Sequence, residues 1–235
     1  MFLYENAWQG ALGRIAEAAR ASGRAPGEIS LLAVSKTFPP AAIRAVHALG
    51  QRAFGENYVQ EALAKMDALQ DLPDVEWHLI GPLQSNKTAV VAARFAWVHS
   101  VDRAKIAARL AAARPATKPP LNVCLQVNIS GEATKSGVPA DAVVALGQAV
   151  AALPALRLRG VMGIAAATAD AALARAQFRL LAGCAADLRR AGLPVDTLSM
   201  GMSADLEAAI AEGATMVRLG TAIFGQRLPA AGPGG

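Results

Sequence analysis

The chain has 235 residues, of which 54% are hydrophobic and 17% are charged. This apolar content excludes an intrinsically disordered protein, and the length fits a single α/β barrel domain. The formal net charge of +5 is scattered, with no run of five or six Lys or Arg, so a nucleic-acid-binding arm is not indicated.

The cysteine content and the distribution of apolar residues bear on the compartment. Cys124 and Cys184 are the two cysteines, too few for a disulfide framework or a four-ligand zinc site by themselves. The start of the chain lacks a basic-then-apolar signal pattern, and Asp141 and Pro154 interrupt the most apolar stretch, residues 140–156. We therefore expect a cytoplasmic protein without a membrane span.

The first three elements are read from the spacing of apolar residues. Apolar side chains at helical spacing predict a helix over residues 4–21. Residues 29–35 are a short apolar run typical of a strand that is buried on both faces. Pro40 lies at the start of the next predicted helix, residues 41–49, which ends at Gly50.

The same alternation continues to the end of the chain. Residues 141–153 are the clearest helix, with Val143, Leu146 and Val150 on one stripe and Asp141 available to cap its start. Further strands are predicted at residues 53–55, 76–80, 97–100, 122–127, 158–162, 197–199 and 216–219. Further helices are predicted at residues 59–69, 87–94, 103–113, 172–191 and 205–212.

Eight strands, each followed by a helix or a short helix-like tail, predict the fold. Strand–helix alternation implies parallel strands, and eight such units can close into a (β/α)8 TIM-type barrel, here with an extra N-terminal helix. A doubly wound open sheet is the alternative, but no glycine-rich turn follows the first strand. We expect one barrel domain over residues 1–227 and a flexible tail over residues 228–235.

Lys36 is the first candidate site residue, because functional groups of such barrels lie at the carboxyl ends of the strands. It terminates an apolar strand, where burial disfavours the ammonium and lowers the pKa of a lysine. A neutral lysine amine is a nucleophile that forms Schiff bases. The alternative is a structural lysine whose ammonium reaches the solvent.

The last two loops suggest an anion site. Gly201 and Ser203 follow the seventh strand, and Gly220 and Thr221 follow the eighth, so both loops combine a close backbone approach with a hydroxyl. Barrels often bind phosphate between these strands through backbone N–H groups. The alternative is an ordinary turn in which Ser203 caps the next helix.

Three polar residues lie within apolar strands. Arg218 needs a partner for its charge, commonly a carboxylate and more rarely a ligand. His78 and His99 are expected as hydrogen-bonded core histidines, and no spacing of His or Cys indicates a metal site. Lys87 and Lys135 are expected as solvated loop lysines, with a second anion site as the alternative for each.

Motifs that follow one another along nearly the whole chain carry a resemblance to a known family. They are residues 31–37 (LLAVSKT), 54–61 (FGENYVQE), 77–87 (WHLIGPLQSNK), 99–102 (HSVD), 127–132 (VNISGE), 135–137 (KSG), 198–203 (LSMGMS) and 216–225 (MVRLGTAIFG). In these motifs the chain resembles the pyridoxal phosphate homeostasis proteins, the YggS/PROSC family. One departure lies at residues 161–165, VMGIA, where the family usually reads Met-Ala-Ile-Pro, which leaves the shape of that loop open.

The resemblance implies a barrel like the amino-terminal domain of alanine racemase, with Lys36 holding pyridoxal 5′-phosphate (PLP) as an internal aldimine. It implies that Arg218 faces the pyridine nitrogen, where a permanent positive charge discourages protonation and weakens the cofactor as an electron sink. The other implied cofactor-binding residues are Ser203, Gly220 and Thr221 at the phosphate, and Asn57 and His78 in the ring pocket.

The resemblance also guides the functional hypotheses. Racemase-like relatives carry a second domain with a catalytic tyrosine, for which we expect no room here, and Tyr4 and Tyr58 are the only tyrosines. We therefore expect a non-catalytic carrier or regulator that binds PLP and affects its supply to apo PLP-dependent enzymes. We expect a monomer because no exposed heptad or long edge strand is evident. The alternatives are a small PLP-dependent amino-acid racemase or lyase, and a barrel whose main role is protein interaction.

Overall fold

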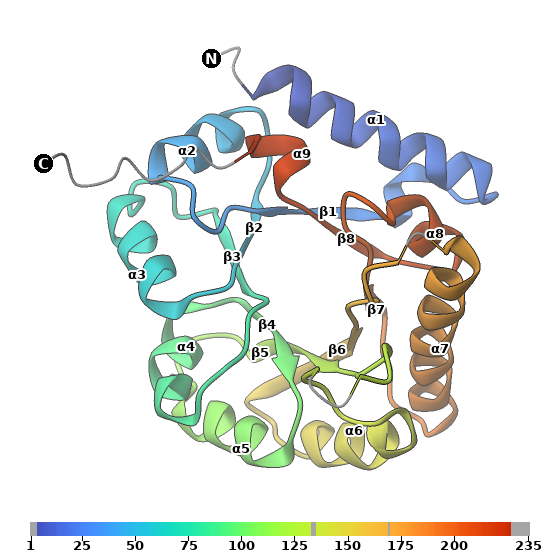
Figure 1. Ribbon diagram of the computed structural model, residues 1–235. Coiled ribbons are helices and arrows are strands. Elements are labelled where there is room, and N and C mark those ends of the chain that lie inside the picture. The colour runs from blue at the N-terminus through green and yellow to red at the C-terminus, as the bar shows by residue number, and fades with distance from the viewer. Residues whose placement is uncertain (1–3, 133–134, 169, 227–235) are drawn as a thin grey trace, which may run out of the picture.

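A ring of eight parallel strands forms the centre of the computed structural model, which describes residues 4–132, 135–168 and 170–226 (Figure 1). Consecutive strands pair, and β8 pairs with β1 to close the ring, so the predicted barrel is confirmed. The strands are β1 (Ser30–Val34), β2 (Ala53–Glu56), β3 (Glu76–Leu79), β4 (Trp97–Val101), β5 (Leu121–Gln126), β6 (Leu156–Met162), β7 (Thr197–Ser199) and β8 (Met216–Leu219).

The helices surround the ring of strands, as the view along the barrel shows (Figure 1). Every predicted helix and strand is present, with ends that differ by one or two residues at most. The helices are α1 (Glu5–Ala21), α2 (Pro40–Ala48), α3 (Val59–Ala68), α4 (Thr88–Arg94), α5 (Ala104–Ala113), α6 (Val143–Ala151), α7 (Ala171–Arg190), α8 (Leu206–Ala211) and α9 (Thr221–Phe224), with 3₁₀ turns at Pro26–Glu28, Ser85–Lys87 and Ala140–Ala142.

The extra helix before the first strand, α1, lies beside α8 and α9 (Figure 1). Its Arg14 donates to both carboxylate oxygens of Glu207, at 2.5 and 2.7 Å, and to the carbonyl oxygen of Ser203 at 2.8 Å. Ile15 and Ala19 are buried on the face that packs on the barrel. The helix therefore fastens the loop that follows β7.

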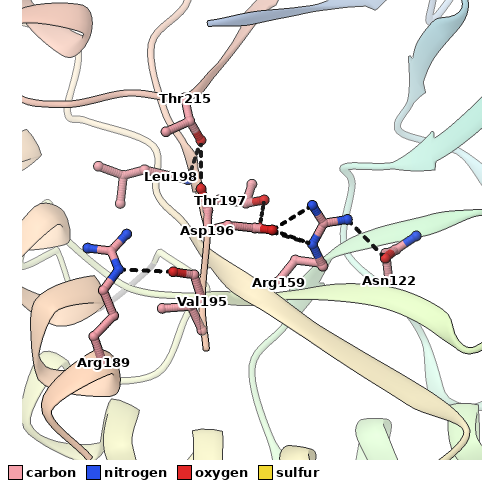
Figure 2. A network of polar contacts seen from close by, with 8 residues as sticks. All are labelled: Asn122, Arg159, Arg189, Val195, Asp196, Thr197, Leu198 and Thr215. Carbon is pink, nitrogen blue, oxygen red and sulfur yellow. Dashed lines mark hydrogen bonds and ion pairs between the residues drawn. The ribbon is translucent and has the colours of Figure 1, made fainter. Parts of the chain in front are cut away.

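A polar network ties β5, β6 and β7 together at their amino-terminal ends, which form the floor of the barrel. Figure 2 shows Arg159 at its centre, with Nε and Nη2 donating to the Asp196 carboxylate at 2.8–3.1 Å. Arg159 also donates to Asn122 Oδ1 at 3.2 Å, and Thr197 donates to Asp196 at 2.8 Å. The floor is thus fixed by charged and polar side chains.

Two predicted helix caps are wrong. Asp141 lies in a 3₁₀ turn, and Ala142 occupies the N-cap position of α6 without a side-chain hydrogen bond. Ser203 does not cap α8, whose N-cap residue is Asp205. In both cases the chain makes a further turn before the helix begins, so the expected capping residue comes too early.

The described ranges form one barrel, and the predicted tail, residues 228–235, lies outside them. Among the helices of these ranges, none has the length and apolar character needed to cross a membrane. The same ranges contain no group of three His, Cys, Asp or Glu side chains that could hold a metal ion.

Candidate functional site

The predicted site residues gather at the mouth of the barrel, where the strands end. Lys36 follows β1, Asn57 follows β2 and Gly220 follows β8, and these three strands are consecutive neighbours in the closed sheet. Ser203 follows β7, the next neighbour of β8. Because parallel strands end on the same side of the sheet, the four residues share one end of the barrel.

Lys36 lies in a turn directly beyond β1, and its side chain is half-buried. The burial expected at a strand end is therefore only partial, because the fully buried position is that of Ser35. No described residue forms an ion pair or hydrogen bond with the Lys36 ammonium. The amine is thus held at the mouth without being committed to a structural contact.

A buried ion cluster clamps the turn that carries Lys36. Lys65 of α3 is 4% exposed and donates to the Ser35 carbonyl oxygen at 2.8 Å and to the carboxylates of Glu56 and Glu61 at 2.7 and 2.6 Å. Ser35 Oγ donates to Glu56 at 2.6 Å. The residue before Lys36 is therefore held through both its carbonyl and its side chain.

The residue after Lys36 is held by the same cluster. Thr37 has a φ of 68°, in the left-handed region that β-branched residues rarely adopt. Its backbone N–H donates to Glu61. Such a conformation costs about 1–3 kcal/mol and persists only where the surroundings fix it, so the cluster defines the path of the chain on both sides of Lys36.

The carboxyl group of Glu56 in this cluster has a shifted pKa. Burial raises the pKa of the Glu56 carboxyl, against the opposing effect of the hydrogen bonds from Lys65 and Ser35. One oxygen, Oε2, is buried and has no hydrogen-bond partner in the described structure. The sequence carried one signal of this cluster, a lysine on the apolar face of a helix, which our sequence reading did not use.

Arg218 is 5% exposed, and its guanidinium lies inside the barrel. Nη1 donates to the carbonyl oxygen and the hydroxyl of Ser199 at 2.7 and 3.0 Å, and Nη2 donates to the Gly163 carbonyl at 2.9 Å. Within the described residues no carboxylate forms an ion pair with it, so the more common of the two expected partners is wrong. Carbonyl oxygens carry no sequence signature, which is why this arrangement could not be foreseen.

Among the residues that the structure describes, none provides a counter-ion for Arg218. Burial lowers the pKa of Arg218 to about 10, against a smaller opposing effect of the Asp205 carboxylate, so the guanidinium stays protonated at neutral pH. A guanidinium has five N–H donors, and the contacts above use three. A buried cation with unused donors favours an electron-rich or anionic acceptor.

Residues 161–165, where the sequence departs from the family pattern, contact Arg218 directly, because the Gly163 carbonyl oxygen accepts a hydrogen bond from it. A Cβ at Gly163 would stand 2.8 Å from Ile129 Cδ1 and 2.9 Å from Leu181 Cδ2. An alanine at this position would therefore require those two side-chain ends to shift. Ile164, the next residue, is 40% exposed at the mouth.

The loops after β7 and β8 each contain a glycine that lies close to neighbouring atoms, with little room for a side chain. Gly201 has a φ of 93°, and a Cβ there would stand 2.6 Å from Ala209 Cβ. Gly220 is the N-cap residue of α9 without a side-chain cap, and a Cβ there would stand 3.1 Å from the Val34 carbonyl oxygen. Ser203 is half-buried, so its hydroxyl lies near the surface of this region.

Asn57 borders a hollow of about 240 Å³ on the other side of the mouth. Its Oδ1 is buried without a hydrogen-bond partner in the described structure. A Cβ at Gly81 would stand 2.1 Å from the Asn57 carbonyl oxygen, so only glycine lets the loop after β3 pack here. The exposed Lys135 also lines this hollow, whereas Lys36, Ser203 and Arg218 do not.

His78 and His99 lie inside the barrel, below the mouth, and both are fully buried. They are hydrogen-bonded, as the sequence predicts for core histidines, and their ring nitrogens lie 2.9 Å apart. His78 has no free ring nitrogen for a ligand at the mouth, since Glu76 occupies the other at 2.9 Å. Its expected place in a ring pocket stays a prediction.

Among the described residues, the mouth therefore combines an amine and an amide oxygen without partners, a buried guanidinium without a counter-ion, and loops that offer a hydroxyl and close backbone approaches. These groups match the different parts of a planar heteroaromatic aldehyde that carries a phosphate. The amine suits the aldehyde, the guanidinium suits a ring nitrogen, and hydroxyl and N–H donors suit the phosphate.

Comparison with known proteins points to relatives whose names refer to such a compound. The model of the family "Alanine racemase, N-terminal domain" matches residues 12–228. The chain is 61% identical over 214 residues to the pyridoxal phosphate homeostasis protein of Pseudomonas aeruginosa, covering 91% of each chain. It is 52% identical over 216 residues to the protein of that name from Escherichia coli, covering 91% of this chain and 92% of the relative.

Solved structures extend the comparison to a bound ligand. The structure of PipY from Synechococcus elongatus with PLP bound is 42% identical and superposes with a TM-score of 0.79. The match covers 90% of this chain and all of PipY (100%).

Proposed function

Because the chain belongs to the alanine racemase N-terminal domain family, we propose that it binds PLP and acts in the homeostasis of this cofactor. Relatives with 61% and 52% identity are named pyridoxal phosphate homeostasis proteins, and the related PipY has been solved with PLP bound. The observation that carries the proposal is the uncommitted Lys36, in a turn clamped by a buried ion cluster, at the same mouth as a buried Arg218 without a counter-ion.

We assign the following roles to the chain's own residues. Lys36 forms the covalent link, in which its amine nitrogen bonds to the aldehyde carbon and the carbonyl oxygen leaves as water. Arg218 offers its unused N–H groups to the ring nitrogen. Ser203, Gly220 and Thr221 bind the phosphate through hydroxyl and N–H groups. Asn57 and His78 complete the surroundings of the ring, His78 from the layer below.

The clamp around Lys36 supports its role as the attachment point. A Schiff base forms with the neutral amine, and its geometry depends on where the lysine backbone is fixed. Lys65, Glu56 and Glu61 fix that backbone on both sides without contacting the Lys36 side chain. The amine is thus placed by a rigid turn and keeps its own atoms free for the cofactor.

The relatives are named homeostasis proteins rather than enzymes, and we propose a carrier or regulator without catalytic turnover. PLP supplies carbanion stabilisation most strongly when its ring nitrogen is protonated. A charged Arg218 beside that nitrogen opposes protonation, and no described acidic residue contacts Arg218 or Lys36. We propose apo PLP-dependent enzymes as recipients and the cytoplasm as the compartment, where the two free cysteines stay reduced.

Mass spectrometry tests the attachment point. The protein is incubated with PLP, reduced with borohydride and digested, and the modified peptide is expected to contain Lys36. Lys36→Ala should lose the visible absorbance of the bound cofactor, whereas Lys118→Ala, an exposed lysine before β5, should keep it. If the wild-type protein takes up no PLP, the proposed function is wrong; if another lysine is modified, the assignment of Lys36 is wrong.

Solvent exchange tests the absence of turnover. The PLP-loaded protein is incubated with a panel of L- and D-amino acids in deuterium oxide, and the α-proton is followed by NMR. We expect no exchange above the level seen with free PLP. Faster exchange with any amino acid would replace the carrier proposal with a racemase or a related lyase.

A further inference from the structure

A column of hydrogen-bonded side chains runs inside the barrel from Glu76 to Arg218. Glu76 Oε1 lies 2.9 Å from His78 Nε2, and His78 Nδ1 lies 2.9 Å from His99 Nε2. His99 Nδ1 lies 3.1 Å from Ser199 Oγ, which accepts a hydrogen bond from Arg218 Nη1 at 3.0 Å. The column joins a partly exposed carboxylate to the buried guanidinium.

The two ends give the column one direction. At one end Arg218 can only donate, so Ser199 Oγ accepts from it, and the one acceptor within reach of the hydroxyl hydrogen in the described structure is His99 Nδ1. At the other end an ionised Glu76 can only accept, so His78 Nε2 carries a hydrogen. Both ends therefore require each histidine to be the neutral Nε2–H tautomer.

The surroundings favour neutral histidines. Burial lowers the pKa of His78, against the opposing effect of Glu76, and burial together with the charges of His78 and Arg218 holds the pKa of His99 well below 6.5. The Trp97 ring stacks on His78 with centroids 5.2 Å apart and planes at 9°. Protonation of His99 would reverse its hydrogen bond with Ser199 and leave the Ser199 hydroxyl without an acceptor, and protonation of His78 would also reverse the bond between the two rings.

Resting on the proposed function, we propose that His78, His99 and Ser199 are positioning residues, which orient Arg218 toward the ring nitrogen of PLP through this one-way column. The column fixes Arg218 Nη1 on Ser199 and so leaves other N–H groups of the guanidinium for the ring nitrogen. Without His99, the Ser199 hydroxyl is free to turn, and Arg218 loses one of the contacts that define its position.

Nitrogen-15 NMR of the histidine side chains tests the direction of the column in the protein without PLP. The chain has three histidines, and His47 lies at the surface, bonded to Asp74 at 2.8 Å, so His→Gln variants assign every signal. Both buried histidines should be neutral Nε2–H tautomers at pH 7.5. A cationic ring, or an Nδ1–H tautomer at either position, would overturn the column as described.

Two substitutions at His99 test its effect on the cofactor. His99→Leu removes the relay, whereas the amide of His99→Gln can still accept from Ser199 and donate to His78. With nitrogen-15-labelled PLP, the wild type and His99→Gln should show an unprotonated ring nitrogen, and His99→Leu should shift toward the protonated form. His99→Leu should also bind PLP roughly tenfold more weakly, the effect of losing about one hydrogen bond to a charged group, and His47→Gln should match the wild type.

The outcomes separate this inference from the proposed function. If the wild type fails to take up PLP, the proposed function fails, while the histidine tautomers are still decided by NMR. If the wild type binds PLP and His99→Leu gives the same ring-nitrogen signal and affinity, the positioning role is wrong. Should His99→Leu not fold, Ser199→Ala removes the hydroxyl alone, and an unchanged ring-nitrogen signal in that variant also contradicts the proposal.

Discussion

Burial holds both cysteines in the unreactive thiol form. It raises the pKa of Cys124 to about 12 and that of Cys184 to about 11. Cys124 lies against Trp97 and Met162 inside the barrel, and Cys184 lies on the buried face of α7 with 2% of its surface exposed. Since the thiolate is the reactive form, we expect both thiols to react slowly with oxidants and alkylating agents in the folded protein.

A thiol titration checks this at the scale of single residues. The native protein should give almost no fast reaction with an aromatic disulfide reagent at pH 8, and the unfolded protein should release two equivalents, one for each cysteine. Cys184→Ala should halve the yield after unfolding and leave the native result unchanged. Rapid labelling of the native wild type would mean that one thiol is more accessible than the structure shows.

Single residues also show what the sequence could predict of the site. The position of Lys36 at the mouth could be predicted because it follows a buried strand, and functional groups of such barrels lie at strand ends. The acceptors of Arg218 could not, because two of the three are backbone carbonyl oxygens, which any residue provides. Lys65 on the apolar face of α3 was a signal that went unused, but its pairing with Glu56 could not be predicted, because only the fold brings these residues of different elements within 2.7 Å.

Strand β2 and helix α3 act together through the ion cluster, and removing its cation tests this. Lys65→Met would leave Glu56 and Glu61 without their shared partner, and breaking a buried ion pair in this way costs about 3–5 kcal/mol. Urea unfolding should show a loss of that order. Lys105→Met, at an exposed position of α5, is the control and should change stability by less than about 0.5 kcal/mol.

The loss in Lys65→Met should have a second signature at the site. Because the cluster holds the backbone on both sides of Lys36, the folded fraction of this variant should retain PLP less well than the wild type after dialysis. Equal retention by the folded variant would show that the turn keeps its shape without the cluster.

The contact between β6 and β7 depends on one glycine. A Cβ at Gly160 would stand 1.8 Å from the Thr197 carbonyl oxygen, a backbone atom that cannot move away alone. Gly160→Ala should therefore lose about 3 kcal/mol or more, through overpacking that separates the two strands. Gly183→Ala, inside α7 with open space around it, should instead gain about 0.5–1 kcal/mol.

Urea midpoints of the two glycine variants provide the comparison. Opposite signs are expected for the same chemical change, one added methyl group. A loss of similar size at both positions would contradict the close approach of β6 to β7. The sequence marks neither position, because the need for glycine arises from the neighbouring strand.

The sequence was sufficient to locate the helices and strands, but it did not predict which residues cap α6 and α8. Apolar periodicity located every strand and helix because the barrel buries both faces of its strands and one face of each helix. The caps at Asp141 and Ser203 were wrong because local chain turns, not side-chain preference, decided where α6 and α8 begin.

For the whole molecule, the buried histidines make stability depend on pH. Because the folded pKa values of His78 and His99 lie below their ordinary value of 6.5, the unfolded chain binds more protons below that pH. Stability should therefore fall as the pH drops below about 6.5, by up to about 1.4 kcal/mol per pH unit for each histidine. Urea unfolding at intervals from pH 8 to 5 measures this loss.

Other titratable groups change the stability at a different pH or with the opposite sign. Glu56, with a raised folded pKa, adds stability as the pH falls through that value. Carboxyl groups with lowered pKa values, such as that of Asp71, lose their contribution only below about pH 4. The acid loss should be smaller in His99→Gln, which lacks one histidine and keeps the rest. Parallel curves for this variant and the wild type would refute a contribution from His99.

Closure of the ring by β1 and β8 places the first strand of the barrel against the last. Lys36 follows one of these strands, and Gly220 and Thr221 follow the other, so the proposed site needs both β1 and β8 in place. During synthesis, ribosome-bound intermediates that expose Lys36 before β8 has left the exit tunnel have only one of these two strands available for folding. Ribosome-stalled intermediates that lack β8 should therefore be empty, open sheets, and vitamin B6 capture should begin only after β8 has paired with β1.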